Sequence, residues 1–276
     1  MNRGIIVLFA ALSLMLTMSA QAAKNPWEQK LPFKSAEIHY EISGMETGTE
    51  VLYIREHGKQ TARYHTGTSK MMGMTMKSDT IQITDPDWVY NFDLVEGTGT
   101  KTINPQKLMI EEFNKLSKAD QKKVIKNAEE QGNSYMVSMG AKVTPKAKEI
   151  MGYQTDMVTV MGSTSYNIHE TPIALLTETN MMGISMKSVA TKFDKKSVSK
   201  DHFNLPPNIT PRPDPEADRM ARNMAQQTIA MLVDPEAHQQ KQGGTDSQQP
   251  EGTDTRSEEQ KQMDEAMNAL KGLFGN

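Results

Sequence analysis

Apolar and polar residues alternate along most of residues 36–104. In the run AEIHYEI, Ile38, Tyr40 and Ile42 fall on one side of the chain and the polar residues between them fall on the other. This period of two is typical of a half-buried strand. Turn signals interrupt the alternation at 57–59 (HGK), 85–87 (DPD) and 96–97 (EG). The pattern predicts an antiparallel meander whose apolar face needs a cover.

The spacing of apolar residues becomes helical after residue 104. The run PQKLMIEEFNKL begins with a proline suited to the first turn of a helix. Ser117 and Asp120 then predict a capping pair for a second helix over residues 119–131, which Gly132 is expected to end. We expect these helices to cover the apolar face of the sheet.

Extended segments are predicted again from residue 134. They are the runs SYMVSMG, KEIMGYQTDMVTVMG, STSYNIHE, PIALLTETN and KSVATKFDKKSV. Prolines at 211–215 end the strands, and apolar residues at helical spacing predict a helix over about 216–233. The expected fold class is α+β, with an antiparallel sheet, helices inserted between its strands, and a helical tail.

The two ends of the chain differ from the rest in composition. Residues 1–22 combine an early basic residue, an apolar run and the small residues Ala20 and Ala22, which predicts a cleavable secretory signal peptide. The apolar run is shorter than the ~20 residues of a membrane-spanning helix. The predicted organisation is a signal peptide (1–22), a sheet-and-helix domain (23–210), a proline-rich segment with an amphipathic helix (211–233), a disordered linker (234–256) and an amphipathic C-terminal helix (257–276).

Composition excludes several classes of function. The chain has no cysteine, which excludes disulfides, thiolate zinc sites and thiol catalysis. Its formal net charge of −3 gives no electrostatic reason to bind nucleic acid. The unusual residue is methionine, with 22 copies.

Several of these methionines lie in two similar stretches, MMGMTMKS at 71–78 and MMGISMKS at 181–188. One interpretation makes both stretches strands of one sheet, with Gly73 and Gly183 at a bulge or a close backbone approach and the methionines as adaptable apolar filler. A second interpretation is a Cu(I) or Ag(I) site, because thioethers are soft ligands. That site would need sulfurs from both copies, or His57 or His65 as helpers. Its candidate ligands are Met71, Met74, Met76, Met182 and Met186. Scavenging of oxidants by exposed methionines is a third interpretation.

Motifs for catalysis are missing from the sequence. There is no G-x-S-x-G, and the S-x-x-K match at 197–200 lies in a charged, strand-like segment without its partner motifs. Asp85 and Asp87 flank a proline and suit a turn. We therefore expect no catalytic residues, no enzymatic activity and no cofactor.

Several segments together resemble the LolA-like superfamily, the periplasmic outer-membrane lipoprotein carriers and their secreted relatives. The resemblance covers about residues 34–208 and rests on AEIHYEISG, TARYHT, MMGMTMKSDTIQITDPDWVYNFDL, a helical insertion, EIMGYQTDMVTV, ALLTETNMMGISMKSVATKF and HFNLPPN. It implies an antiparallel sheet curled into a half-barrel, helices across the concave face, and an apolar cavity between them that suits acyl chains. The tail from Pro211 onward departs from the family.

We therefore expect a periplasmic, non-enzymatic protein that holds a lipid, a lipoprotein acyl chain or another apolar ligand in a half-barrel cavity. The C-terminal helix is expected to plug that cavity or to bind an envelope protein, and no nucleic-acid partner or membrane span is expected. The alternatives are a periplasmic Cu(I)/Ag(I)-binding protein and an envelope protein-interaction module. The expected cavity wall comprises Tyr40, Ile42, Leu52, Ile54, Met74, Met76, Trp88, Tyr90, Met157 and Met186.

Overall fold

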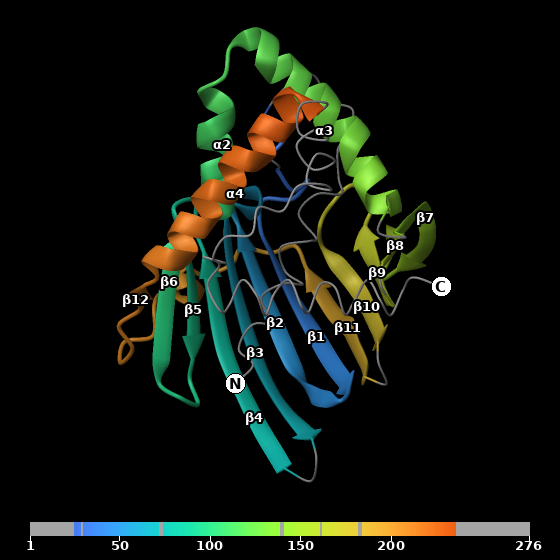
Figure 1. The fold of residues 1–276 in the computed structure, drawn as a ribbon. Coiled ribbons are helices and arrows are strands. Elements are labelled where there is room, and N and C mark those ends of the chain that lie inside the picture. Colours follow the sequence, from blue (N-terminus) through green and yellow to red (C-terminus); the bar gives the residue numbers. More distant parts are fainter. Residues whose placement is uncertain are drawn as a thin grey trace, which may run out of the picture. The chain divides into compact units, whose positions relative to one another are not determined.

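The computed structural model describes residues 25–28, 30–71, 74–138, 141–160, 162–181 and 184–235 (Figure 1). These residues belong to one compact unit that extends to Pro235. The predicted signal peptide and C-terminal helix lie outside the described residues, as does the predicted linker after Pro235.

The described strands form one open sheet, and its order across the sheet is β12-β6-β5-β4-β3-β2-β1-β11-β10-β9-β8-β7. Neighbouring strands are antiparallel, except that β12 runs parallel to β6. In chain order the strands are β1 (Ala36–Gly44), β2 (Glu46–Arg55), β3 (Gln60–Met71), β4 (Met74–Thr84), β5 (Trp88–Asp93), β6 (Thr98–Ile103), β7 (Lys142–Ile150), β8 (Tyr153–Val160), β9 (Ser163–Ile168), β10 (Ala174–Met181), β11 (Ile184–Asp194) and β12 (Arg212–Pro213).

Within the described residues, helices occupy three stretches between and after the strands. They are α2 (Pro105–Asn114), α3 (Lys118–Ser138) and α4 (Pro215–Val233), with short 3-10 turns at η2 (Glu56–Gly58) and η3 (Lys200–Phe203). The α+β class predicted from the sequence is confirmed. No helix in the described ranges is both long enough and apolar enough to cross a membrane.

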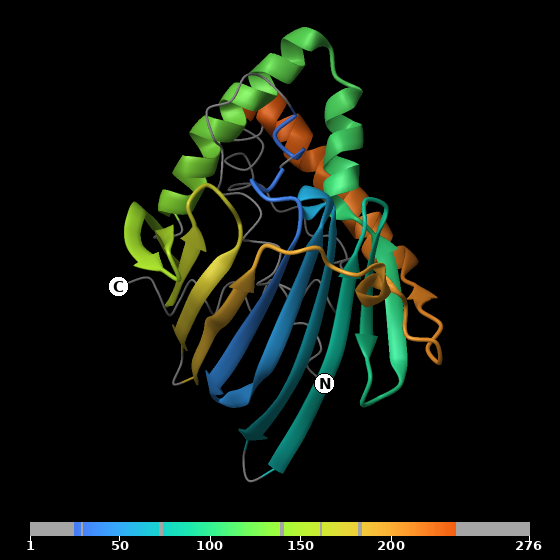
Figure 2. The same ribbon diagram turned by 180° about the vertical axis from the view of Figure 1, so that it is seen from behind.

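Helices α2 and α3 connect strands that lie near opposite edges of the sheet. β6 lies next to one edge of the sheet and β7 forms the opposite edge, and α2 and α3 are the chain between them. Figures 1 and 2 show these helices and α4 gathered at one end of the strands. Helix α3 continues through Gly132, where we expected it to end. The predicted strand over 134–140 is wrong, because α3 runs to Ser138.

Cross-strand register assigns each residue to one of two faces, because directly opposite side chains point to the same side. One face, the Ile38 face, carries Ile38 opposite Leu52 and Tyr40 opposite Glu50. The other, the Tyr53 face, carries Tyr53 opposite Ala62. The predicted alternation in β1 is confirmed, since its apolar residues share the Ile38 face.

Each face has an apolar core over a different part of the sheet. On the Ile38 face, the segment before β1 contributes Leu31 and Phe33, which pack on Ile38, Leu52 and Ile54. On the Tyr53 face, the chain between β11 and β12 crosses the sheet, on the side that faces the viewer in Figure 2. Its Phe203 and Ile209 pack on the core formed by Ala62, Ile81, Ile83 and Phe92. Non-helical segments therefore cover much of the apolar sheet surface.

The helices bury most of their apolar residues against one another. Phe113 of α2, Val124 of α3 and Ile229 of α4 form a third core, against which Trp27 packs. Helix α4 contacts both α2 and α3, and it meets the sheet at β6. We expected α2 and α3 to cover the apolar sheet face, but their described apolar residues that join a core belong to this third core and to neither sheet core. Helix α4, which the sequence placed outside the sheet domain, is thus part of the same compact unit.

Candidate ligand-binding surface

The two methionine stretches lie at the tips of two long hairpins. The first joins β3 to β4, where Met71 is opposite Met74, and the second joins β10 to β11, where Met181 is opposite Ile184. Each stretch therefore spans the end of one strand and the start of the next. Residues 72–73 and 182–183, which include Met182 and both predicted bulge glycines, lie outside the described residues.

Four methionines near these tips have exposed side chains. Met74 and Met76 of β4 are 63% and 48% exposed, Met186 of β11 is 37% exposed, and Met45 at the β1–β2 turn is 38% exposed. Met74, Met76 and Met186 are on the Ile38 face, since Met76 is opposite Ser69 and Met186 is opposite Gly44. We call Met45, Met74, Met76 and Met186 the methionine rim. Exposed apolar side chains along one end of a sheet are candidates for a binding surface.

A charged cluster of Glu46, Glu50, Arg63 and His65 lies between the methionine rim and the Ile38-face core. His65 Nε2 is 2.9 Å from Glu46 Oε1, and His65 Nδ1 is 3.9 Å from Glu50 Oε2. Arg63 donates to Glu50 through its guanidinium group. The side chains of Glu50 and His65 are only 13% and 17% exposed. The ion pair and hydrogen bonds of these four residues form an ordered polar surface.

Gly67 makes room for this cluster. It is buried on β3, and a Cβ atom at this position would collide with the carboxylate of Glu46. Glu46 crosses over Gly67 to reach His65, so the absence of a side chain at 67 is a condition for that hydrogen bond. Sequence reasoning singled out only His65 from the cluster. The turn at 56–59 could have identified Glu50 as well. It places Arg55 opposite Gln60, and the same register places Glu50 opposite His65.

The predicted cavity wall is divided between the two faces of the sheet. Tyr40, Ile42, Leu52, Ile54, Met74, Met76 and Met186 belong to the Ile38 face. Trp88 and Tyr90 belong to the Tyr53 face, since Tyr90 is opposite Ile83. Met157 lies on β8, opposite Tyr166. These ten side chains therefore cannot line one cavity, and that part of our expectation needs correction.

The members of the predicted wall also differ in burial. Tyr40, Leu52 and Ile54 are part of the packed core. The hydroxyl of Tyr40 donates to the Ala174 carbonyl over 3.0 Å, and burial raises the pKa of Tyr40 far above its ordinary value. These three residues have no free surface for a ligand. The methionine members of the predicted wall that lie on the rim are exposed and free to make contacts.

Strand geometry separates the sulfurs of the two methionine stretches. β4 and β11 are four strand spacings apart in the sheet, or about 19 Å at about 4.8 Å per spacing. Among the described residues, no cluster of three or more His, Asp or Glu side chains is arranged to hold a metal ion. A single Cu(I) or Ag(I) ion therefore cannot be shared by Met76 and Met186.

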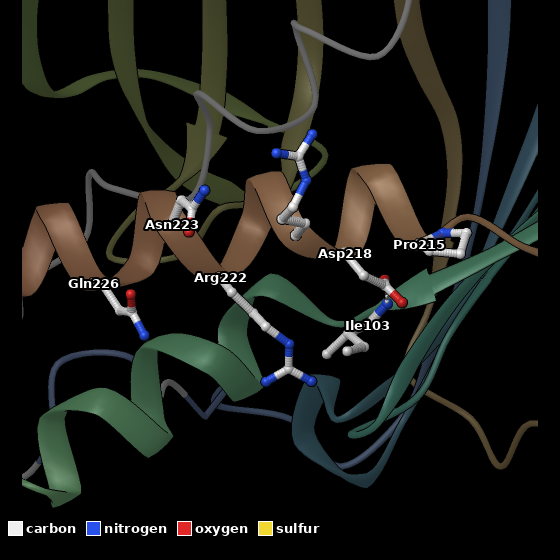
Figure 3. A pocket seen from close by; sticks show the side chains of 7 residues that line it. Ile103, Pro215, Asp218, Arg222, Asn223 and Gln226 are labelled. Atoms are coloured by element: carbon white, nitrogen blue, oxygen red, sulfur yellow. Dashed lines mark hydrogen bonds between the residues drawn. The ribbon is translucent and has the colours of Figure 1, made fainter.

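A groove of about 340 Å³ lies elsewhere, along helix α4 (Figure 3). Its position is fixed by Asp218, whose carboxylate accepts the backbone N–H of Ile103 over 2.7 Å and so ties α4 to β6. Figure 3 shows Asp218 beside Ile103, and Arg222 and Gln226 extending from the same helix toward α2. None of the predicted wall residues lines it. The lining residues are Ile103, Pro215, Asp218, Arg219, Arg222, Asn223 and Gln226.

Comparisons with known proteins give distant structural similarity. No model of a known protein family and no curated protein matches the chain. An uncharacterized conserved protein from Thermus thermophilus is similar with a TM-score of 0.40 and 6% identity, over 66% of this chain and 92% of that one. The structure of PNGF-II is similar with a TM-score of 0.36 and 13% identity, over 72% of this chain but only 33% of that one.

Proposed function

We propose that this protein is a non-enzymatic, periplasmic binding protein that holds a lipid, a lipoprotein acyl chain or another apolar ligand against the methionine rim. The observation that carries the proposal is the exposure of Met74, Met76 and Met186 at one end of the Ile38 face. Methionine side chains are flexible and polarizable, so they suit ligands of variable shape. A sheet curled into a half-barrel around the apolar ligand, as in LolA-like carriers, is part of this proposal.

The polar surroundings of the rim favour an amphipathic ligand. Glu46 starts at the rim, next to Met45, and its carboxylate bonds His65 further along the face. An acyl chain on the methionines would remove apolar area from water, at about 25 cal/mol per Å². The polar end of the same ligand would meet the charged cluster. An apolar surface with a polar border is the usual composition of such sites.

The edges of the sheet are protected, which disfavours recognition of a partner by strand addition. Edge strand β7 contains Pro145 and Lys146, and its pairing with β8 is irregular between Thr144 and Lys148. At the other side, β12 pairs with β6 and α4 packs near it. Proline, lysine and irregular pairing are devices that prevent edge-to-edge association. The rim is therefore the better candidate for binding.

A fluorescent fatty acid tests the proposal. The double variant Met76→Glu/Met186→Glu puts carboxylates on the rim, and we expect it to bind the probe at least about tenfold more weakly, because an acyl chain cannot pair with a carboxylate. The matched control is Met220→Glu/Met224→Glu on α4, where the methionines are 58% and 61% exposed. Equal affinity of the rim variant and the wild type would contradict the proposal.

A further inference from the structure

Three aromatic rings surround the side chain of Lys195. The Nζ atom lies 4.7 Å from the ring centre of Tyr153, 5.6 Å from that of Phe33 and 5.9 Å from that of Phe193. The rings stand edge to face, with Phe193 centred 5.5 Å from Phe33 and 4.8 Å from Tyr153. We call Phe33, Tyr153 and Phe193 the aromatic box. The faces of three rings are turned to one cation, which is the arrangement that attracts positive charge.

Two lysines near Lys195 form ion pairs instead of contacts with the rings. Lys196 is 2.8 Å from Glu37, and Lys192 is 3.1 Å from Asp194. No carboxylate in the described part of the chain pairs with Lys195, although it is next to Lys196 in sequence. Because side chains alternate along an extended chain, Lys196 reaches the acidic residues of the Tyr53 face while Lys195 reaches the rings on the Ile38 face. The contacts of its ammonium group are therefore with the aromatic box.

The aromatic box is held in place by the protein core. Phe33 is buried in the Ile38-face core, and Tyr153 and Phe193 pack against that core. The rings come from the segment before β1, the start of β8 and the end of β11, so the fold and not local sequence sets their geometry. Lys195 itself is exposed. A rigid box with an exposed, flexible occupant is suited to exchange that occupant for a ligand.

We propose that the aromatic box is a binding site for a quaternary ammonium group, such as that of choline, and that Lys195 occupies it in the free protein. A primary ammonium is strongly hydrated and loses water contacts over the rings. A trimethylammonium group is poorly hydrated and presents methyl groups to the ring faces, so it gains more from the same box. Its entry displaces Lys195 into water. The site is independent of the methionine rim.

Titration with choline chloride, followed by ligand-observed NMR, tests the site without any acyl chain. We expect wild type to bind choline more tightly than ethanolamine, which lacks the methyl groups. Lys195→Ala should bind choline about threefold more tightly, because the internal competitor is gone. The matched control is Lys101→Ala, which removes a lysine that lies 4.5 Å from the Trp88 ring, and it should leave choline affinity unchanged.

Variants of the box separate binding from folding. Tyr153→Leu keeps apolar bulk and should weaken choline binding about fivefold, and Tyr153→Phe should restore it. Sedimentation with phosphatidylcholine or phosphatidylglycerol vesicles distinguishes a lipid headgroup from free choline as the source of the cation. The proposal is overturned if Lys195→Ala binds choline no better than wild type, or if ethanolamine binds as well as choline.

Discussion

Met76 and Met186 lie in one cross-strand row on the same face of the sheet, with β3, β2 and β1 between them. Met76 is opposite Ser69, Ser69 is opposite Glu46, and Met186 is opposite Gly44 at the end of the adjoining strand. The repeated sequence therefore supplies the two sides of one surface. Ser69, Glu46 and Gly44 lie between the two methionines in this row, so the relationship disfavours a shared metal ion and puts polar side chains between two apolar ends.

The double variant Met74→Leu/Met76→Leu separates these two functions. Leucine keeps the apolar area of the rim, so we expect the affinity for a fluorescent fatty acid to change less than about twofold. Any binding of Cu(I), measured against a chromogenic chelator, should be as weak in wild type as in the variant. Stoichiometric Cu(I) binding by wild type that the variant loses would instead support the metal interpretation.

Gly67 and Glu46 should be energetically coupled. Gly67→Ala pushes the Glu46 carboxylate away from His65, and we expect it to lower the free energy of unfolding by about 1–2 kcal/mol. In a Glu46→Ala background the same change should cost less than about 0.5 kcal/mol, since the obstacle is removed. Urea unfolding of the four proteins in this cycle measures the coupling. Additive effects would show that Glu46 does not need the space at Gly67.

Asp218 should carry much of the attachment of α4 to the sheet. Asp218→Ala leaves the N–H of Ile103 without its acceptor, and we expect a loss of about 2 kcal/mol in the free energy of unfolding. Asp218→Asn keeps an oxygen acceptor and should lose less. Gln226→Ala, in the same groove, is the control and should stay within about 0.5 kcal/mol of wild type. Thermal or urea unfolding would reveal the order, and an equal loss in all three variants would contradict it.

The lowered pKa of Glu37 predicts that its contribution to stability is lost in acid. Hydrogen bonds from Lys196 and His39, in that order, lower the pKa of Glu37 from 4.5 to about 2. Because the pKa is lower in the folded state, the contribution is complete above pH ~4.5 and is lost as the pH falls toward 2. Glu37→Gln should therefore reduce stability by about 1 kcal/mol at pH 7, and this difference should shrink to near zero at pH 2. A difference that persists at pH 2 would rule out the ion pairs as its source.

Much of the strand order could be predicted from the sequence, because each strand carries its own alternation and its own turn signal. The sequence could not show which residues of different strands share one face of the sheet. Whether Trp88 shares a face with Tyr40 depends on the register across every intervening strand, and a shift of one residue reverses the answer. The structure puts Trp88 on the Tyr53 face, so the predicted wall combined residues from opposite sides.

Contacts between segments that are distant in sequence could not be predicted either. The apolar stripes of α2 and α4 show that each helix needs a cover, but not that they cover each other. The aromatic box joins Phe33, Tyr153 and Phe193 from distant segments, and no local pattern connects them. By contrast, the capping pair Ser117 and Asp120 was predictable because both residues lie in one turn. It is confirmed, with the Asp120 N–H donating to Ser117 Oγ over 3.1 Å.

Native mass spectrometry of the full protein, purified gently from its host without detergent, tests the central claim most directly. We expect a population with added mass that is released as a lipid or an acylated species, and that is reduced in Met76→Glu/Met186→Glu. The same protein found bare, and unable to take up a fatty acid added at equal concentration, would contradict the claim that the methionine rim holds an apolar ligand.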